Sequence, residues 1–594
     1  MDGGMAMKKT IPILLILLIL SACLCACNTQ EPEMLADPQN IQVANRVITW
    51  DPVENASGYL VSFDGEEYQI EETSFSYHFI TLADTYRFSV IALGDGKNYS
   101  NSAIASKEIT IEPPVERGSD KHGFKYTYID DIGGYEIDAG TADLSGMVVL
   151  PDYFGDWPVK RIAGRMFKAK GAYATYQAEP NCFTEAYCNK TTTGIQLPAY
   201  LESIGMDAFA FILNLEEIEI PDTVVEIGSE AFEGCKRLKK VVLPSNLKEI
   251  PRSCFENTAL SEIILPEGLE RIGGSAFATP ETKYSTGGLF GGSAYGHIDS
   301  EVSEIVIPAS VKEIASKAFY GRRNMKTVVI KGDLQDFSSG TFHDTAWLAS
   351  QPEGLVYLND ALYCYHGQMP ENTRIEIPAG TKSICHHAFN GEANLYEVVI
   401  PEGIAFWGIQ IFASCTSLTK VTLPSDVKVI ADAMFSDCTS LKNITIPETV
   451  TRIEKGAFAY TGLESLIIPA SVKYVGAYAF AYCESLKNVS FSAGVEILND
   501  YVFECCSALE TALIPATVKE IYCHPFSYCD ALTHVFFEGG SFLEFEEKLR
   551  DTADEFLAEL KAAPIYYYSE EKPTEEGNFW HYVDGKPTPW ESEE

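Results

Sequence analysis

Basic residues are scarce in this sequence. Its 594 residues include 44 Lys and Arg against 84 Asp and Glu, which gives a formal net charge of −40 at pH 7. Nucleic acids and anionic membranes are bound by clusters of Lys and Arg that displace counterions. The composition therefore argues against both as the main partner, and solubility of an exported surface protein is the simplest use of so much negative charge.

Motifs that carry known catalytic or metal chemistry are also missing. The sequence has no Gly-x-Ser-x-Gly turn, no His-Glu-x-x-His motif, no phosphate-binding Gly-Lys-Ser/Thr loop and no EF-hand loop. Its densest set of metal-ligand types is Cys364, His366, Cys385, His386 and His387. Their spacing matches no usual structural zinc pattern, and zinc stays open only as a minor alternative. We expect no enzyme, no catalytic residue, no metal site and no cofactor.

Long hydrophobic runs are missing except at the N-terminus. Lys8 and Lys9 precede an apolar run over 11–20, which is too short to span a bilayer and is typical of a signal peptide. Two short segments that end in Cys23 and Cys27 follow directly. Both resemble the lipobox of bacterial lipoproteins, in which the cysteine becomes the lipidated N-terminus of the mature chain.

The lipobox resemblance implies a signal peptide over 1–22, lipidation at Cys23 and a polar tether over 23–36. Cys27 is the alternative lipidation site, and a cleaved secretory signal with incidental cysteines is the alternative to lipidation. No later run is apolar enough to span a membrane. We therefore expect an extracytoplasmic, cell-surface protein that is lipid-anchored to the bacterial membrane and meets the membrane only through that anchor.

What the sequence does contain is a repeat of 22 or 23 residues, interrupted by insertions. A proline that follows a short apolar strand recurs at Pro198, Pro221, Pro244, Pro266, Pro308, Pro378, Pro401, Pro424, Pro447, Pro469 and Pro515. A phenylalanine recurs at Phe209, Phe232, Phe255, Phe277, Phe319, Phe342, Phe389, Phe412, Phe435, Phe458, Phe480, Phe503 and Phe526. Such a period indicates a stacked solenoid, in which each repeat buries its apolar face against its neighbours.

One copy of the repeat shows how it should fold. Ile218 and Ile220 alternate with acidic residues before Pro221, so the isoleucines should point inward and the acids should face solvent. Gly228 should permit the following turn. The consensus Ile-Pro-x-x-Val-x-x-Ile-Gly-x-x-Ala-Phe-x-x-Cys resembles the BspA-like leucine-rich repeat surface proteins. Over 123–540, this resemblance implies an extracellular right-handed solenoid associated with adhesion.

The chain has 16 cysteines, but their spacing does not indicate a disulfide framework. Six of them lie three residues after a repeated phenylalanine: Cys235, Cys415, Cys438, Cys483, Cys506 and Cys529. Because a cysteine at a fixed position of a repeat behaves as a small apolar filler, we expect buried thiols there. Cys182 and Cys188 lie together in one insertion and form the pair for which a disulfide is predicted.

Residues 37–113 alternate as short strands with turns between them. Trp50, Tyr59 and the pattern from Leu82 to Val90 resemble a fibronectin type III domain, which implies an immunoglobulin-like β-sandwich. A spacer is the simplest role for it, and residues 114–122 are predicted to be a linker. Residues 541–594 are predicted to form an amphipathic capping helix and an aromatic tail. We expect the tail to pack on the last coils, and binding of sugar rings is its alternative use.

The predicted fold class is therefore mainly β, with short helical or irregular convex segments. An immunoglobulin-like sandwich precedes a leucine-rich repeat solenoid. On the strand face of that solenoid, the residues two before the prolines include an apolar stripe: Val242, Ile264, Val306 and Val329. An exposed apolar stripe with a polar rim commonly marks a protein-binding surface. The alternative is that β-branched residues simply suit exposed strand positions.

Three insertions are the other candidate binding segments. The one over 279–300 carries Tyr284, Phe290 and Tyr295, and the others follow Phe167 and Phe342. Loops on a rigid scaffold often carry recognition, although neutral decoration is an equal alternative here.

We predict a monomeric, non-catalytic surface protein that binds a matrix, host-cell or bacterial surface protein through its concave strand face and loops. A glycan-binding lipoprotein for nutrient capture is the second prediction. A glycan-active enzyme is the least favoured one.

Overall fold

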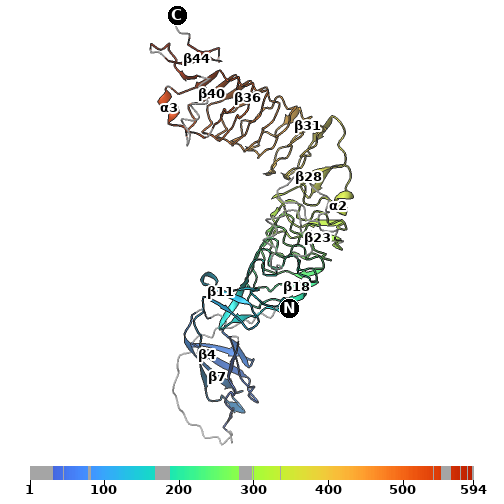
Figure 1. Ribbon diagram of the computed structural model, residues 1–594, viewed down its shortest axis with the longest axis vertical. Helices are drawn as coiled ribbons and strands as arrows, with labels where there is room; N and C mark the ends of the chain where they lie inside the picture. Colours follow the sequence, from blue (N-terminus) through green and yellow to red (C-terminus); the bar gives the residue numbers. More distant parts are fainter. Residues whose placement is uncertain are drawn as a thin grey trace, which may run out of the picture. The chain divides into compact units, whose positions relative to one another are not determined.

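In a computed structural model, drawn as a ribbon in Figure 1, the chain forms two compact units. It describes residues 31–44, 46–77, 80, 82–167, 188–279, 298, 300–334, 336–522, 524–539, 541–549, 564–574, 577–584 and 586–590. Unit 1 comprises Met1–Lys170 and Cys188–Gly228, and unit 2 comprises Gly171–Tyr187 and Ser229–Glu594. The domain boundaries expected from the sequence stay predictions.

Unit 1 begins with a sandwich of two antiparallel sheets. One sheet has the order β2 (Gln42–Ala44), β3 (Val47–Thr49) and β6 (Ser74–Ser76). The other has the order β5 (Glu66–Ile70), β4 (Gly58–Phe63), β7 (Thr85–Leu93) and β9 (Ala105–Thr110). A short parallel pair, β1 (Glu33–Met34) with β8 (Tyr99–Ser100), lies outside these sheets. This confirms the predicted sandwich architecture, while its assignment to the fibronectin type III family stays a prediction.

Aromatic side chains fill the core between the two sheets. The rings of Trp50 and Tyr59 meet edge to face at 5.4 Å, and Phe88 is fully buried beside them. The Tyr86 hydroxyl donates a hydrogen bond of 3.0 Å to the Leu82 carbonyl. A tyrosine hydroxyl that bonds a backbone carbonyl a few residues upstream is the tyrosine corner of immunoglobulin-like domains, and Tyr86 forms such a corner here.

The first coil of the solenoid is closed by an antiparallel sheet. Its strands are β10 (Arg117–Ser119), β11 (Lys125–Ile129) and β12 (Gly134–Asp138), with the 3-10 turn η1 (Asp130–Ile132) between the last two. Parallel pairing then continues through β15 (Trp157–Ile162), β17 (Ser203–Ile204) and β19 (Glu226–Ile227). A second strand row contains β13 (Gly146–Val149), β16 (Thr192–Gln196) and β18 (Glu217–Glu219), and β14 (Tyr153–Phe154) pairs with β15.

The short strand β10 lies within the segment 114–122, which the sequence predicts to be a linker. Gly118 allows this strand to pack, since a Cβ atom there would lie 2.5 Å from the Phe154 ring. The sandwich also contacts the first coil through Arg46, which is 2% exposed. Its guanidinium donates to the Ile80 and Asp156 carbonyls and lies 4.9 Å from the centre of the Trp157 ring.

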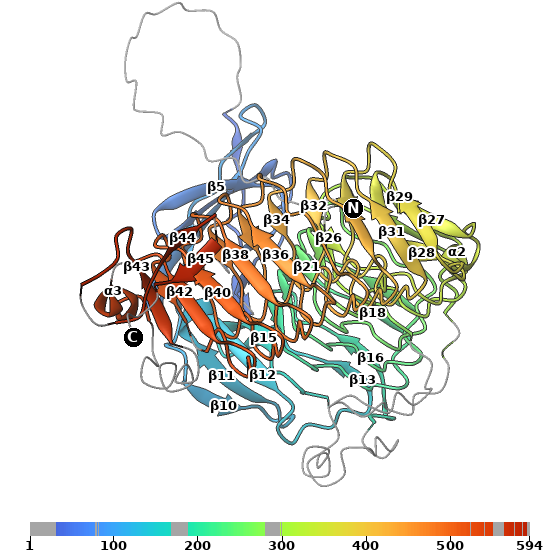
Figure 2. The same ribbon diagram turned by 90° about the horizontal axis from the view of Figure 1, so that it is seen from above.

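Unit 2 continues the solenoid as two rows of parallel strands (Figure 2). The longer strands are β20 (Lys240–Val242), β23 (Glu304–Ile307), β25 (Thr327–Ile330), β29 (Thr373–Glu376), β31 (Leu395–Val399), β33 (Lys420–Thr422), β36 (Ser465–Ile468), β38 (Asn488–Phe491), β40 (Thr511–Ile514) and β42 (His534–Phe537).

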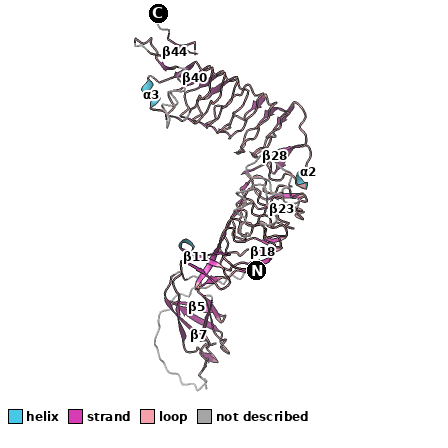
Figure 3. Cartoon of the chain, viewed as in Figure 1, coloured by secondary structure: helices cyan, strands magenta, loops and turns pink. Residues whose placement is uncertain are grey.

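The second row consists mostly of two-residue strands. They are β21 (Glu249–Ile250), β22 (Arg271–Ile272), β24 (Glu313–Ile314), β26 (Asp336–Phe337), β30 (Ser383–Ile384), β32 (Phe406–Trp407), β34 (Val429–Ile430), β35 (Arg452–Ile453), β37 (Tyr474–Val475), β39 (Ile497–Leu498) and β41 (Glu520–Ile521). Turns complete each coil. In the described part of the chain the α-helices are α2 (Ala346–Ala349) and α3 (Phe542–Glu546), so the mainly β fold class is confirmed (Figure 3).

The repeated phenylalanines of unit 2 form the core. Their rings stack at 5.3–5.5 Å from Phe232 to Phe342 and at 5.3–5.6 Å from Phe389 to Phe526. The insertion after Phe342 forms the predicted hairpin, β27 (Gly354–Leu358) with β28 (Ala361–His366), but it does not project as a loop. Its fully buried Tyr363 packs 5.9 Å from the Phe342 ring, so the hairpin is part of the core.

The alternation predicted for one coil is confirmed in unit 1. Ile218 is 4% and Ile220 is 2% exposed, while Glu217 and Glu219 face solvent. Gly228 has a different role from the predicted one. Its φ is not in the left-handed region, but a Cβ atom there would lie 2.4 Å from the Met206 nitrogen of the preceding coil. Glycine therefore allows two coils to approach closely.

The repeated cysteines form a second column beside the phenylalanines. Cys415, Cys438, Cys483 and Cys506 are fully buried, as predicted. Each Sγ donates to the carbonyl of the phenylalanine in the preceding coil, at 3.1–3.2 Å. Cys529 makes the same contact with Phe503 at 3.1 Å and is only half-buried. The thiols thus link successive coils as well as filling space.

The C-terminal segment extends the row of longer strands. After β42 follow β43 (Ile565–Tyr568), β44 (Phe579–Val583) and β45 (Lys586–Pro589), paired in that order. Trp580 is fully buried against Leu513 and Phe536, and its Nε1 donates to the Phe537 carbonyl at 2.9 Å. The predicted packing of the tail is confirmed. The predicted capping helix is shorter than expected in the described residues, since α3 has five residues and 551–563 lie outside them.

Candidate functional site

The apolar stripe on the strand face is exposed at three of its four positions. The exposed fraction is 44% for Val242, 69% for Ile264 and 39% for Val329, whereas Val306 is half-buried. Val306 and Val329 are direct neighbours in the pairing of β23 with β25. Two residues earlier along the chain lie the exposed polar residues Lys240, Glu262, Glu304 and Thr327. The stripe therefore has the apolar centre and the polar rim that the sequence predicts.

The stripe ends where the character of the strand face changes. Later coils place Glu376, Thr422, Thr445 and Ser490 at the equivalent position, and all four are exposed. Two apolar residues are isolated among them: Val399, which is half-buried, and Ile467, which is 71% exposed. The last two positions, Leu513 and Phe536, are covered by Trp580 and are not available to a ligand. Burial also argues against Trp580 as a sugar-binding ring.

Several predicted site residues lie outside the described residues. They are Cys23, Cys27, Cys182, Tyr284, Phe290 and Tyr295. Lipidation, the Cys182–Cys188 disulfide and the aromatic insertion therefore stay predictions. No helix in the described ranges is both long enough and apolar enough to cross a membrane.

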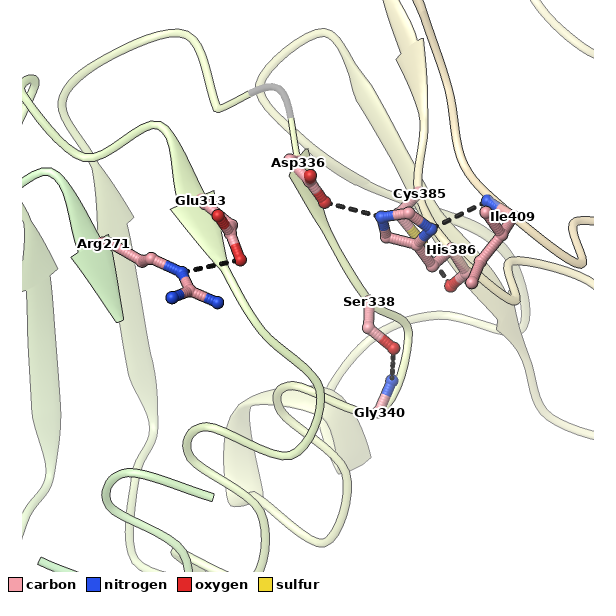
Figure 4. Close-up of polar contacts among 8 residues, drawn as sticks. All are labelled: Arg271, Glu313, Asp336, Ser338, Gly340, Cys385, His386 and Ile409. Atoms are coloured by element: carbon pink, nitrogen blue, oxygen red, sulfur yellow. Dashed lines mark hydrogen bonds and ion pairs between the residues drawn. The ribbon is translucent and has the colours of Figure 1, made fainter. Parts of the chain in front are cut away.

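The Cys and His residues that the sequence groups together have structural roles, and two of them, Cys385 and His386, are drawn in Figure 4. Cys385 is fully buried and its Sγ donates to the Tyr363 carbonyl at 2.6 Å, while burial raises the pKa of the Cys364 thiol to about 12. Raised thiol pKa values disfavour the thiolate that a metal requires. His366 lies apart, with Nδ1 3.4 Å from the Pro352 carbonyl.

Both ring nitrogens of His386 are occupied. Nδ1 accepts a hydrogen bond of 2.7 Å from the Ile409 amide, so the ring proton is on Nε2, which lies 2.6 Å from Asp336 Oδ1. The side chain thus connects three coils, as Figure 4 shows. Arg271 makes a similar connection, since it bonds Glu249 and Glu313 at 2.9 Å each. With no unoccupied nitrogen, His386 is not placed to act as a general base.

The repeat architecture agrees with the family comparison. The family described as BspA type leucine-rich repeat region (6 copies) matches residues 179–286, 292–351, 361–484 and 451–548, together more than half of the chain. The chain belongs to the BspA-type leucine-rich repeat family. It is a repeat scaffold of that family, and the predicted family resemblance is confirmed for the solenoid.

Several solved proteins are similar to this chain at low identity. A leucine-rich repeat protein from Bacteroides ovatus is 19% identical and covers 75% of this chain and 98% of its own, with a TM-score of 0.26. A leucine-rich cell surface protein from Faecalibacterium prausnitzii is 20% identical, with 74% and 99% coverage and a TM-score of 0.27. The pneumococcal vaccine antigen PcpA is 18% identical, with 76% and 94% coverage and a TM-score of 0.28. No curated protein matches the chain.

Proposed function

We propose that this protein is a non-catalytic adhesion protein of the bacterial cell surface, which binds another protein through the apolar stripe. The observation that supports this proposal is the exposure of Val242, Ile264 and Val329 on adjacent parts of one strand face. Surface patches of this kind lose unfavourable contact with water when a partner covers them. Membership of the BspA-type family favours a scaffold role over catalysis.

The rigidity of the surrounding coils supports binding without rearrangement. The inward residues of the same strands, such as Ile305 and Ile307, are fully buried, and the stacked phenylalanines lie behind them. A surface held by such a core loses little conformational entropy when a partner binds. The lipid anchor at Cys23, the extracytoplasmic location and the monomeric state belong to the same proposal.

The test is a double substitution on the stripe. Ile264→Lys with Val329→Lys places two charges on exposed positions without disturbing the core. A bound partner would bury both ammonium groups at a high cost in free energy, so we expect binding to fall at least about 100-fold. Val306 is left unchanged, because it is half-buried. Binding is measured on a panel of purified extracellular-matrix proteins, at low and high salt.

The matched control is Ile467→Lys, on the same strand face and 71% exposed but beyond the stripe. It should leave binding unchanged. Saturable binding by the parent chain that persists in the folded double variant would refute the role of the stripe. Binding restricted to a glycan panel would instead support a carbohydrate receptor.

A further inference from the structure

Two columns of side chains, mostly tyrosine, run along the turns of the last coils of unit 2. The first column lies two residues after the stacked phenylalanines and consists of Tyr460, Tyr482, Cys505 and Tyr528. The second lies two residues before them and consists of Tyr478, Tyr501 and His524. Tyr460 and Tyr528 are 46% and 70% exposed. The columns are on the turns and not on the strand face, so they are distinct from the apolar stripe.

Neighbouring rings within each column stack face to face. The ring centres of Tyr460 and Tyr482 are 4.4 Å apart with 5° between the planes, and those of Tyr478 and Tyr501 are 5.2 Å apart with 14°. Tyr501 and His524 are 5.7 Å apart. Because stacked rings cover one another, a ligand such as a sugar ring has no room between them.

The backbone at all seven positions is in the left-handed region, with φ between 50° and 60°. A side chain in this conformation crowds the backbone. Earlier coils nevertheless place many residue types in it, such as Phe211, Glu230, Lys317 and Gln410, so the left-handed turn is common to the repeat. What distinguishes the last coils is that rings occupy successive turns, and the exposure of Tyr460 and Tyr528 shows that burial in a core does not explain them.

The surroundings of the columns are acidic. The turn segments 454–464, 476–486, 499–509 and 522–532 contain one basic residue, Lys455, against six acidic ones: Glu454, Glu464, Glu484, Asp500, Glu504 and Asp530. The Glu504 carboxylate raises the pKa of the nearby Tyr482 hydroxyl to about 12. A ligand that covers this surface therefore gains by carrying positive charge.

One ring face at the start of the second column is open. Tyr478 stacks on Tyr501 with one face, and the coil on its other side has Gly456 at the equivalent position. A Cβ atom at Gly456 would meet no neighbour closer than Ala433 Cβ, at 4.0 Å. In the first column, the position before Tyr460 is held by Asp437. The second column thus ends on the Tyr478 ring with the recess at Gly456 beside it. The first column ends on the Tyr460 ring, with Asp437 at the preceding position.

We propose that the two tyrosine columns bind a basic, extended segment of a partner protein. Its Arg side chains lie over the end rings, Tyr478 and Tyr460, and pair with the carboxylates around the columns. A guanidinium is attracted to the negative face of an aromatic ring. This second surface does not depend on the proposed function of the apolar stripe.

The experiment measures binding of a fluorescent nona-arginine peptide to the whole chain at physiological salt. Tyr460→Asn with Tyr478→Asn removes both end rings without changing charge, and asparagine tolerates the left-handed backbone. We expect a loss of affinity of about tenfold, the sum of two such contacts. Tyr396→Asn is the matched control, because Tyr396 is 43% exposed on β31 and lies away from the columns.

A second variant tests the recess without altering any tyrosine. Gly456→Arg places a guanidinium of the chain itself beside Tyr478, and we expect it to weaken the peptide as the double variant does. Thr445→Arg adds the same charge on the strand face and should have little effect.

Thermal unfolding of each variant checks that it is folded. If the double tyrosine variant does not fold, peptide binding by the Gly456→Arg variant tests the proposal instead. Equal peptide affinity in the parent chain and in the folded column variants would overturn the proposal, since binding would then reflect overall acidity alone. Cello- or manno-oligosaccharide binding that is lost in the column variants, with the peptide unaffected, would overturn it in favour of a glycan site.

Discussion

At the scale of single residues, Arg322 carries a buried charge that is paired with neutral groups. It is fully buried, and its guanidinium donates to the Phe277 carbonyl at 2.6 Å and to Ser300 Oγ at 2.7 Å. Two further hydrogen bonds reach Thr258, at 3.2 and 3.3 Å. Burial lowers the pKa of Arg322 to about 9. The side chain thus joins the two ends of the aromatic insertion, before and after 280–299, through neutral acceptors.

We predict that Arg322→Lys lowers the free energy of unfolding by about 2–4 kcal/mol. An ammonium cannot reach the four acceptors that the planar guanidinium joins, so buried oxygens lose their donors while a buried charge remains. Urea unfolding followed by circular dichroism measures the change. Lys326→Arg, at an exposed position four residues after Arg322, is the control and should be neutral within about 0.5 kcal/mol. A neutral result for Arg322→Lys would show that the hydrogen bonds contribute little.

At the scale of elements, stacked rings hold successive coils together, and in several coils a buried thiol adds a hydrogen bond to the preceding coil. The Cys438 Sγ donates to the Phe412 carbonyl at 3.1 Å, and the Phe412 ring stacks 5.5 Å from Phe435. Burial raises the pKa of Cys438 from its ordinary value of 9.0 to about 12. The folded state therefore keeps this proton over a range of pH in which the unfolded chain has lost it.

The pH dependence follows from that difference. Between pH 9 and about 12 the unfolded chain binds fewer protons than the folded chain at Cys438, so the free energy of unfolding falls as the pH rises. The contribution of this thiol is fully present below pH 9. We predict that Cys438→Ala, which cannot titrate, reduces the slope by about 1.4 kcal/mol per pH unit within that range.

Urea unfolding of both proteins at pH 8, 9.5 and 10.5 under reducing conditions measures the slope. Cys529→Ala tests the same effect at a second thiol, because burial is the main cause that raises the pKa of the half-buried Cys529 to about 12. Identical slopes in the parent chain and in Cys438→Ala would contradict the prediction.

At the scale of the whole molecule, the solenoid is closed at its ends by added strands. In unit 1 the antiparallel strands β10, β11 and β12 complete the first coil. In unit 2 the strands β43, β44 and β45 continue the sheet after β42. A parallel sheet that ended at β42 would present unpaired backbone groups and the apolar side chains of Leu513 and Phe536, and such edges associate with one another.

We predict that a chain truncated after residue 563 self-associates. Removing β43 to β45 uncovers the β42 edge and the surface that Trp580 covers. Light scattering coupled to size exclusion, over a tenfold range of concentration, should show a mass that rises with concentration. A chain that lacks only residues 591–594 keeps all three strands and is the control. A truncated chain that stays monomeric and folded would show that the tail is not needed to protect the edge.

The candidate surfaces differ in how far the sequence predicts them. The exposure of Val242, Ile264 and Val329 follows from strand alternation in a known register, because their neighbours must face the core. The tyrosine columns carry a visible signal in the sequence, a tyrosine two residues from each of the last four repeated phenylalanines, but the sequence does not show their stacking. The stacking depends on how one turn lies against the next.

The sequence by itself determined the repeat, its core of phenylalanine and cysteine, and the inward side of each strand. A period of 22 or 23 residues forces equivalent residues into contact, so the local pattern defines the core. Only the tertiary structure decided that Tyr363 enters the core, that β10 is a strand, and that the tail covers Leu513 and Phe536. These contacts join segments that share no period, and their partners are fixed only when the coils are assembled.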